Sequence, residues 1–506
     1  MQTGSIVKPL PWRISTKLVW GLMIVGLLGL APIVPVDHDE SQYLAAAALT
    51  RSGLPFVDFL HLQTPLQSFV TAPIAALSGG YSYLVLRITS AIAALATLWF
   101  VFRCQRRLGV GDRTAICATA LLSLTYSFQF GATLVRNDMM PAVLLTIGLY
   151  AAIVAIEGRR SALLWAIAGL AFSAAVGTKL SYAVPAAAVG LFHLLTVRQR
   201  RSRQSLIDAS ACAAGALVGL APVAFLYAQV PAAFIYGVFD YGADAPFQWY
   251  RATGQGYRLG LDWKLLDTAV VLLLGPACVA LAVVATTLFH RDKRSGAHLL
   301  LDLLVVAGVI AALLPTPTWR QYLIPLLPVL FVRLGLAWHE GAVGARRRPI
   351  MIGAFAVTAI VGLVQPMLWV SRFVGGKNNP IRMTREAHWI GATLRAAGAQ
   401  GGVATLSPHV VVDSGFPLDP RFANGPFAYR SGDLLSDQEQ RNLITLSPRT
   451  LDRFLAEQPP VAIVTGYEDK PPIILDARLR AFAVANRYRL ERSPYGDAEL
   501  FVRPRH

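Results

Sequence analysis

Charged residues are scarce in this chain: Asp, Glu, Lys and Arg make up 15% of its 506 residues, and hydrophobic residues 55%. A soluble protein of this size carries more charge. There are only four cysteines, which all lie in or beside apolar runs: Cys104, Cys117, Cys212 and Cys278. We therefore expect small, buried hydrophobic side chains at these positions and no disulfide framework.

Several signatures of well-known protein classes are also absent. The sequence contains no Walker loop, paired CxxC, HExxH or GxSxG motif, so nothing in it indicates ATP use or a zinc-protease site. We see no internal repeat, which weakens the case for a transporter built from duplicated halves. Lys8, Arg13 and Lys17 precede the first apolar run, but no small-residue cleavage site follows it. We expect this run to remain as a membrane anchor.

What the chain has in abundance is apolar runs of about 18 residues or more, the length that crosses a bilayer as a helix. Eleven spans are predicted, at residues 18–36, 81–102, 114–134, 139–156, 161–177, 180–197, 206–229, 265–289, 299–314, 321–338 and 349–371. The chain is therefore predicted to be a polytopic α-helical membrane protein.

Short basic clusters lie between the apolar runs, and they set the orientation. They are Arg103/Arg106/Arg107, Arg159/Arg160, Arg198/Arg200/Arg201/Arg203, Arg291/Lys293/Arg294 and Arg346/Arg347/Arg348. Such clusters mark cytoplasmic loops, and they account for the net charge of +17 without a nucleic-acid partner. With eleven spans, the N-terminus is then cytoplasmic and the C-terminus extracytoplasmic. Multi-pass insertion in a bacterial inner membrane is the expected location.

The same topology divides the chain into two parts. Residues 1–372 form a transmembrane module with long outer loops at 37–80 and 230–263, and residues 65–77 are expected to be a short interfacial helix. From residue 373 to 506, charge and Pro/Gly content rise, which predicts a small extracytoplasmic α/β domain. We expect strands at 403–406 and 461–465, helices at 383–397 and 448–457 with Ser447 as N-cap, and a hairpin around 494–497.

Three carboxylates follow the first apolar run directly, at Asp37, Asp39 and Glu40. A carboxylate at the membrane surface can act as a general base if it reaches the acceptor proton, and Asp39 is the best candidate. Glu40 lies beside it, and like charges so close raise one pKa. The alternative is that these acids cap the next helix. One acid suffices for a cap, however, and three are present.

Other charged residues fall at the outer ends of predicted spans, and each has a plain alternative. Asp138, next to Arg136, either faces the same cavity as Asp39, where it would serve a metal ion or sugar hydroxyls, or merely opens the following helix. Lys179 either neutralises a phosphate or is a snorkelling lysine in a turn. Arg320 suits phosphate recognition, or else forms an interfacial anchor with Trp319 and Tyr322.

Two further features each allow a functional and a plain interpretation. Arg87 comes early in its span on the outer side, and it either meets a ligand or pairs with a loop carboxylate. The 230–263 loop combines aromatic and acidic residues, which suits sugar recognition and suits an ordinary interfacial belt equally well.

The order of these features resembles that of the GT-C glycosyltransferases, in particular the bacterial branch related to protein O-mannosyltransferases and lipid A aminoarabinose transferases. Short motifs carry the resemblance: Asp39-Glu40-Ser41-Gln42-Tyr43, Gly53, His61-Leu62-Gln63-Thr64-Pro65-Leu66, Gly79/Gly80, Arg87, Arg136-Asn137-Asp138, Thr178-Lys179 and Arg320-Gln321-Tyr322-Leu323-Ile324-Pro325. It covers roughly residues 15–370, and a C-terminal extracytoplasmic domain is usual in this group.

The resemblance implies an enzyme that moves a monosaccharide from a polyprenyl-phosphate donor to an acceptor hydroxyl on a glycolipid, a glycan or a protein. Asp39 would be the general base of an inverting transfer, and Lys179, Arg320 and Arg87 would stabilise the departing phosphate. Glu40, Arg136, Asp138 and Tyr322 complete the implied substrate-binding set. A divalent cation is left open, with Asp39 and Asp138 as its candidate ligands.

Two other classes of function remain as alternatives. A transporter or flippase of lipid-linked sugars would also need outer cations and a groove. It should carry ionisable residues deep in its helices, however, and the predicted spans have few. A non-catalytic assembly protein would use the C-terminal domain to bind a partner.

Overall fold

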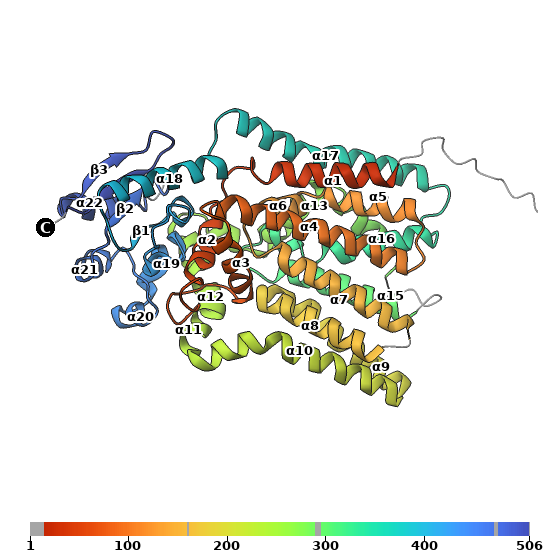
Figure 1. The fold of residues 1–506 in the computed structure, drawn as a ribbon. Helices are drawn as coiled ribbons and strands as arrows, with labels where there is room; N and C mark the ends of the chain where they lie inside the picture. The colour runs from red at the N-terminus through yellow and green to blue at the C-terminus, as the bar shows by residue number, and fades with distance from the viewer. Residues whose placement is uncertain (1–14, 159–160, 289–294, 470–473, 505–506) are drawn as a thin grey trace, which may run out of the picture.

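The computed structural model describes residues 15–158, 161–288, 295–469 and 474–504. Long helices run side by side along the molecule, and a small sheet with its own helices lies at one end of them (Figure 1). Lys8, Arg13 and the predicted basic clusters Arg159/Arg160 and Arg291/Lys293/Arg294 lie outside the described residues.

Seven helices of the described chain are long and apolar enough to cross a membrane. They are α4 (Ser82–Arg107), α7 (Met139–Glu157), α8 (Ser161–Thr178), α9 (Ala183–Arg200) with the preceding turn η1 (Leu180–Tyr182), α10 (Arg203–Gln229), α15 (Gly296–Leu313) and α17 (Arg348–Val374). Two bent pairs raise this number to nine: α5 (Asp112–Ser123) with α6 (Tyr126–Thr133), and α13 (Leu261–Leu273) with α14 (Ala277–Ala285).

The two remaining predicted spans coincide with shorter apolar helices, α1 (Thr16–Leu30) and α16 (Leu327–His339). Each of the eleven predicted segments therefore contains a helix or a bent helix pair. The bends are sharp, 70° between α5 and α6 and 104° between α13 and α14. Hydropathy cannot reveal such bends because it averages over the whole segment.

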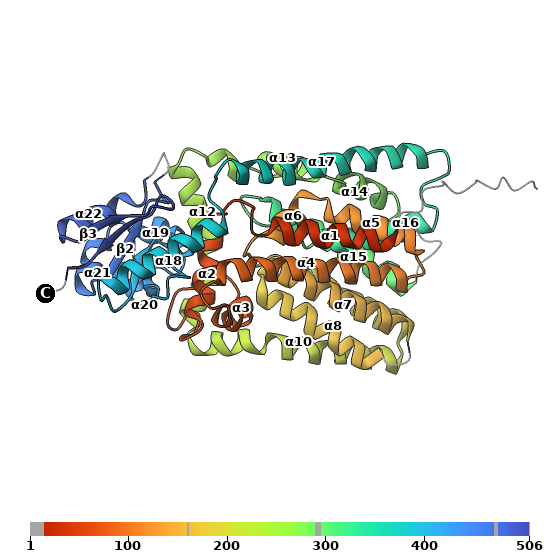
Figure 2. The same cartoon turned by 45° about the horizontal axis from the view of Figure 1, so that its top comes forward.

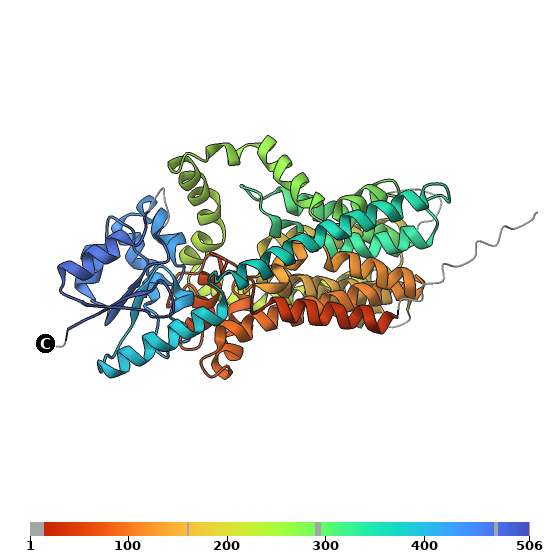
Figure 3. The same ribbon diagram turned by 90° about the horizontal axis from the view of Figure 1, so that it is seen from above.

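The predicted outer segments are more helical than expected. The first holds α2 (Glu40–Leu49) and the expected helix α3 (Leu66–Leu77). The second, the segment 230–263 between two predicted spans, is largely helical: it forms α11 (Pro231–Ile235), the π-helical turn η2 (Tyr236–Asp240), α12 (Tyr241–Ala252) and the turn η3 (Gly256–Leu259). Figure 3 shows α12 and α13, in light green, standing out from the bundle as an arch. Several of its aromatic residues, which suited either sugar recognition or an interfacial belt, face the C-terminal region and a cavity beside it.

The C-terminal region contains a four-stranded sheet in the order β1-β2-β4-β3. Its strands are β1 (Val403–Thr405), β2 (Ala462–Thr465), β3 (Arg489–Arg492) and β4 (Glu499–Val502). β1 and β2 are parallel, and β4 is antiparallel to both β2 and β3. This confirms the expected α/β character and the hairpin. Helices α18 (Pro380–Ala396), α19 (Pro426–Ser431), α20 (Asp437–Asn442), α21 (Leu451–Glu457) and α22 (Ala477–Ala485) complete this part.

The predicted start of α21 is wrong. The helix begins at Leu451 with Thr450 as its N-cap, not at Pro448 after Ser447. Ser447 donates its backbone N–H to the Thr450 hydroxyl oxygen at 3.1 Å, and that hydroxyl donates to Gln440 at 2.5 Å. These contacts fix residues 447–450 as a turn before the helix starts.

The C-terminal region packs directly on α2, α3 and α4 (Figure 2). The Asp413 carboxylate accepts the backbone N–H groups of Ser82 and Tyr83, at 2.6 and 3.2 Å, and thereby caps the N-terminus of α4. The Ser41 hydroxyl lies 2.6 Å from Nδ1 of buried His409. The Asn424 amide donates to the Leu60 carbonyl at 2.7 Å. The segment after α1 is therefore held between the bundle and the sheet.

Inside the bundle, α8 and α10 are in unusually close contact because glycines replace side chains at their interface. A Cβ added to Gly215 would lie 1.9 Å from the Ala166 carbonyl oxygen, and one added to Gly169 would lie 1.9 Å from that of Cys212. Gly215 and Gly219 are four residues apart, so they share one helix face, as in the GxxxG pattern of membrane helices.

This contact predicts that Gly215→Ala forces α8 and α10 apart and destabilises the protein by about 1–3 kcal/mol, the usual cost of overpacking. Gly190→Ala on α9 is the matched control, because a Cβ there meets nothing within 4 Å. Thermal unfolding in detergent should show a lower midpoint for Gly215→Ala alone. Equal midpoints for the two variants would contradict the close packing.

Candidate active site

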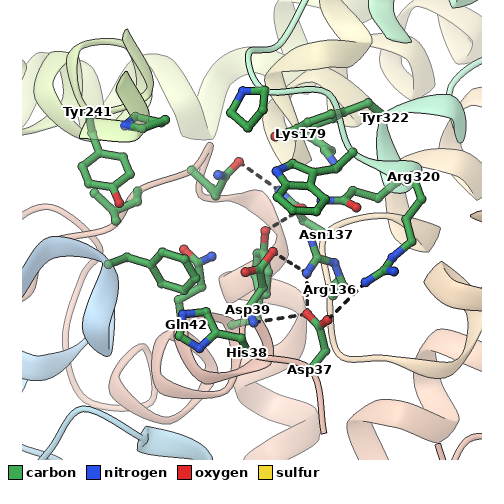
Figure 4. Close-up of a pocket in the computed structure, with 18 of the residues that line it drawn as sticks. Asp37, His38, Asp39, Gln42, Arg136, Asn137, Lys179, Tyr241, Arg320 and Tyr322 are labelled. Carbon is green, nitrogen blue, oxygen red and sulfur yellow. Dashed lines mark hydrogen bonds and ion pairs between the residues drawn. The ribbon is translucent and has the colours of Figure 1, made fainter. Parts of the chain in front are cut away.

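A cavity of about 410 Å³ lies where the bundle meets the C-terminal region. It is lined by residues from segments far apart in the sequence, including Asp37, His38, Asp39, Gln42, Tyr43, Gln63, Phe130, Arg136, Asn137, Lys179, Tyr241, Tyr250, Trp319, Arg320, Tyr322, Phe427 and Arg430. Figure 4 shows the acids after α1 opposite the cations that follow α6, α8 and α15. Five residues predicted from the sequence therefore line one cavity: Asp39, Arg136, Lys179, Arg320 and Tyr322.

Arg136 is the central cation of this site. Its Nη1 lies 2.7 Å from Asp37 Oδ1 and also donates to Asp39 Oδ2, and its Nε donates to Asp138 Oδ2 at 3.0 Å. Only 4% of the Arg136 side chain is exposed, whereas 29% of Asp39 is. Arg136 thus holds Asp39 in place while leaving part of that carboxylate open to the cavity.

Asp138 lies behind this cavity and not in its wall. Its carboxylate is fully buried and accepts from Lys179 Nζ at 2.5 Å as well as from Arg136. It makes no side-chain cap contact with α7, so it does more than open that helix. Asp138 therefore positions two cations of the site, and its carboxylate oxygens are both occupied.

The neighbouring Asn137 links three further segments. Its Oδ1 accepts from the Tyr43 hydroxyl at 2.8 Å, and its Nδ2 donates to Gln63 Oε1 at 3.1 Å and to the Thr178 carbonyl at 3.3 Å. Lys179 follows Thr178 directly. The Arg136-Asn137-Asp138 motif accordingly joins α2, the segment before α3 and the end of α8 in one hydrogen-bonded unit.

The two acids of the cavity, Asp37 and Asp39, form an acid cluster in which the two pKa values shift in opposite directions. Burial alone would raise the pKa of Asp39, but the charges of Arg136 and then His38 outweigh it and hold the pKa below its ordinary value. Burial raises the pKa of Asp37, even though Arg136 opposes this effect, and the nearby charges of Asp39 and Glu40 add to the rise. Asp39 is therefore the cavity acid whose ionised form its surroundings favour.

His38 connects the acid cluster to the C-terminal region. Its Nδ1 lies 3.3 Å from Glu468 Oε1, and its ring packs edge-on against Phe427 with centroids 4.8 Å apart. Burial would lower the pKa of His38, but the hydrogen bond and charge of Glu468, together with Asp39, raise it. A protonated His38 ring places its charge beside Asp39 and further favours the ionised carboxylate.

Arg320 is the most accessible of the predicted cations. Its side chain is 31% exposed, and its Nη2 lies 3.9 Å from Asp37 Oδ2, a long ion pair. The guanidinium lies over the Phe130 ring at 4.0 Å and donates to the Tyr126 hydroxyl at 2.5 Å. Tyr322 also lines the cavity, with its ring centre 5.2 Å from Lys179 Nζ.

The structure does not bring Glu40 and Arg87 to the cavity. Both side chains are fully buried and form a two-bond ion pair, Nε to Oε1 at 2.8 Å and Nη2 to Oε2 at 2.5 Å. Glu40 also accepts from the Tyr83 hydroxyl and from the backbone N–H groups of Asp37 and Val135. Arg87 thus pairs with a loop carboxylate, the alternative considered from the sequence, and the pair has a structural place behind the site.

The helix-cap interpretation of Asp39 is not supported either. Asp39 occupies the N-cap position of α2 but makes no side-chain hydrogen bond to the helix. Its carboxylate points to Arg136 instead, and it is Asp37 Oδ1 that accepts the Asp39 backbone N–H, at 3.2 Å.

The proposed divalent-cation ligands do not form a metal centre. Asp39 and Asp138 are both engaged by Arg136, and Asp138 also by Lys179. No group of three or more His, Cys, Asp or Glu side chains among the described residues is arranged to hold a metal ion. The chemistry derived below uses only side chains of this chain.

Sequence reasoning missed the contribution of the C-terminal region, whereas the aromatic residues of 230–263, which include those of α12, were already candidates for sugar recognition. Phe427 and Arg430 from α19 line the cavity, as do Tyr241 and Tyr250 from α12. The pattern Pro426-Phe427-Ala428-Tyr429-Arg430, with aromatic residues and an arginine together in a polar region, was the available signal. It gives no indication of the distant segment on which it packs.

The buried pair predicts a large loss of stability when one partner is removed. Arg87→Gln leaves the Glu40 carboxylate buried without its cation, which typically costs about 3–5 kcal/mol. Arg103→Gln, at the exposed opposite end of the same helix, is the control and should stay within about 0.5 kcal/mol of the wild type. Thermal unfolding in detergent measures both, and equal midpoints would show that the pair does not hold this region together.

Comparison with known proteins identifies the fold. Residues 62–226 match the family described as dolichyl-phosphate-mannose-protein mannosyltransferase. ArnT from Cupriavidus metallidurans, solved bound to undecaprenyl phosphate, superposes with a TM-score of 0.65 at 15% identity, over 96% of this chain and 97% of that chain. The Archaeoglobus fulgidus oligosaccharyltransferase, in complex with Zn and sulfate, gives a TM-score of 0.53 at 14% identity, over 97% of this chain and 73% of that chain. A search of curated proteins gives no match.

These matches confirm the fold expected from the motifs. At such low identity the solved structures establish the architecture, including the C-terminal region, since nearly the whole chain is covered. The family match adds a sequence relationship over the segment that contains Gln63, Arg136, Asp138 and Lys179. The chain is a multi-pass membrane glycosyltransferase that shares the GT-C fold of ArnT, and its residues 62–226 match the dolichyl-phosphate-mannose-protein mannosyltransferase family.

Proposed function

We propose that this enzyme transfers a monosaccharide from a polyprenyl-phosphate donor to an acceptor hydroxyl, with Asp39 as the general base. The observation that carries the proposal is the arrangement in the cavity, which is lined both by Asp39, a partly exposed carboxylate with a lowered pKa, and by the accessible cation Arg320. The fold is shared with ArnT, which was solved with undecaprenyl phosphate bound, and this supports a lipid phosphate as the donor's carrier.

The reaction needs a base that takes a proton late in the transfer. An acceptor hydroxyl attacks the anomeric carbon while the bond from that carbon to the phosphate oxygen breaks. As the new C–O bond forms, the hydroxyl proton becomes acidic, so a carboxylate with a lowered pKa can still accept it. Attack from the face opposite the phosphate inverts the configuration. Arg136 and His38 keep Asp39 charged and oriented until that moment.

The leaving phosphate gains negative charge as its bond to the sugar breaks. Arg320 has donor capacity left, since its Nε is buried without a hydrogen-bond partner and its ion pair with Asp37 is long. Lys179 and Arg136 also line the cavity and add positive potential there, although their own contacts are with carboxylates. A fixed cation at the position where charge develops lowers the barrier without reorganisation of the site.

The proposed orientation places this cavity and the C-terminal region on the extracytoplasmic side of a bacterial inner membrane. The basic clusters Arg198/Arg200/Arg201/Arg203 and Arg346/Arg347/Arg348 support it, because they lie at helix ends remote from the sheet (Figure 1). Glycolipid, glycan and protein acceptors all remain compatible with a site on this side.

A transporter is disfavoured by the same structure. Two buried ion pairs lie inside the described helices: Arg87 binds Glu40, and Arg333 Nε binds Asp302 Oδ1 at 2.8 Å. A transport path needs ionisable groups that a substrate can reach. The fold and the family match are those of glycosyltransferases.

Asp39→Asn should reduce sugar transfer by at least about 100-fold, the lower range of what a general base contributes. The variant should fold normally, because Asn keeps the shape of the side chain. Mass spectrometry of envelope glycolipids from a deletion strain identifies the product, and the same strain complemented with the variant measures its activity.

Asp244→Asn serves as the control, since Asp244 is an exposed carboxylate of α12 outside the cavity. It should restore the product fully. Near-normal product in the Asp39→Asn strain would rule out Asp39 as the base.

Arg320→Gln should weaken binding of undecaprenyl phosphate by about 10- to 100-fold, which corresponds to the 1.5–3 kcal/mol of a hydrogen bond to a charged group. Arg103→Gln is the matched control. The Arg103 guanidinium also lies over an aromatic ring, 5.7 Å from the ring centre of Trp99, but it lies near the C-terminal end of α4 and does not line the cavity. Titration of the purified variants with undecaprenyl phosphate gives the two affinities. Unchanged affinity in Arg320→Gln would remove Arg320 from the phosphate site.

A further inference from the structure

Arg430 is a cavity cation that no sequence motif of the membrane part predicts. It belongs to α19 of the C-terminal region and lines the cavity together with Phe427. Its guanidinium carbon lies 4.4 Å from the ring centre of Trp249 in α12 and 4.8 Å from that of Phe427. Two aromatic rings from different segments therefore fix its position.

The contacts of Arg430 differ from those of the other buried cations. Arg136 binds three carboxylates, and Lys179 binds one. In the part of the chain that the structure describes, no carboxylate lies within ion-pair distance of Arg430. Stacking engages the faces of the guanidinium, and a hydrogen bond to the Tyr241 side chain uses part of its donor capacity. A guanidinium carries five N–H donors, so Arg430 can still donate to a ligand in the cavity.

Arg430 and Arg320 approach the acid cluster from different segments. The charge of Arg320 acts on Asp37, whereas that of Arg430 acts on His38 and Asp39. Arg320 follows the end of α15, at the boundary of the membrane helices, where the phosphate of a lipid carrier must stay. Arg430 comes from the region beyond those helices, which an acceptor has to pass.

We propose that Arg430 binds oxygen atoms of the acceptor and orients its hydroxyl toward Asp39, while Arg320 binds the donor phosphate. This inference rests on the proposed function, and it makes the C-terminal region part of the active site. It also explains why an arginine is held between Trp249 and Phe427, since a fixed guanidinium loses less freedom when it binds a ligand.

The test compares Arg430→Gln, Arg430→Lys and Arg320→Gln in two measurements. The first is affinity of the purified proteins for undecaprenyl phosphate, and the second is glycolipid product in the complemented deletion strain. Arg430→Gln should lower the product by about tenfold or more, as expected when a hydrogen bond from a charged donor is lost, and leave undecaprenyl phosphate affinity within about twofold. Arg430→Lys should restore part of the product, because it keeps the charge.

Arg441→Gln is the matched control. Arg441 also lies in the C-terminal region, 4.2 Å from the Phe454 ring centre, and it pairs with Glu457 outside the cavity. It should behave as the wild type in both measurements. Thermal unfolding of each variant separates a loss of folding from a loss of acceptor binding.

Three results would overturn the inference. Product within twofold of the wild type in Arg430→Gln is one, and a loss of undecaprenyl phosphate affinity equal to that in Arg320→Gln is another. The third is a lowered unfolding midpoint together with no rescue by lysine, which would make Arg430 purely structural. If both Arg430→Gln and Asp39→Asn retain product, the proposed function itself is wrong. If Asp39→Asn loses product while Arg430→Gln retains it, only the role of Arg430 is wrong and the proposed function stands.

Discussion

Glu40 accepts hydrogen bonds from Arg87, from the Tyr83 hydroxyl and from the backbone N–H groups of Asp37 and Val135. Each donor belongs to a part of the chain that the site needs. Asp37 begins the acid cluster, and Val135 directly precedes Arg136. Arg87 in turn donates to the carbonyls of Ala31, Val34 and Pro35, which end the first helix. A buried charge must be paired and fully hydrogen-bonded, so this one carboxylate fixes the acids and the central arginine relative to each other.

The cations that line the cavity are of two kinds. Arg136 and Lys179 form ion pairs with carboxylates, and they serve mainly to hold Asp39 and to give the cavity wall a positive potential. Arg320 and Arg430 are held by aromatic rings instead, at 4.0 Å from Phe130 and 4.4 Å from Trp249, and keep donors for ligands. The site thus separates cations that position the base from cations that can bind substrates, with Asp39 facing the same cavity as both kinds.

Much of this could be predicted from the sequence, and the failures have physical reasons. The spans follow from hydropathy, and placing Asp39, Arg136, Lys179 and Arg320 at one end of the helices follows from the alternation of spans. The placing of Glu40 and Arg87 behind the cavity does not, because burial of a charge depends on partners up to 95 residues away, such as Val135. The helices within 231–252 were not predicted, because short helices between spans leave no long apolar run in the sequence. Arg430 was missed because its stacking partner, Trp249, is distant from it in the sequence, so no local pattern joins the two residues.

The central claim is that one cavity holds the lipid phosphate beside Asp39, and a structure of the protein with undecaprenyl phosphate bound tests it most directly. The account predicts the phosphate within hydrogen-bonding distance of the Arg320 guanidinium, in the cavity that Asp39 and Tyr322 line. It also predicts that Asp39 remains bound to Arg136 in that complex. A phosphate bound elsewhere, with Arg320 free of it and Asp39 facing an empty cavity, would contradict the account.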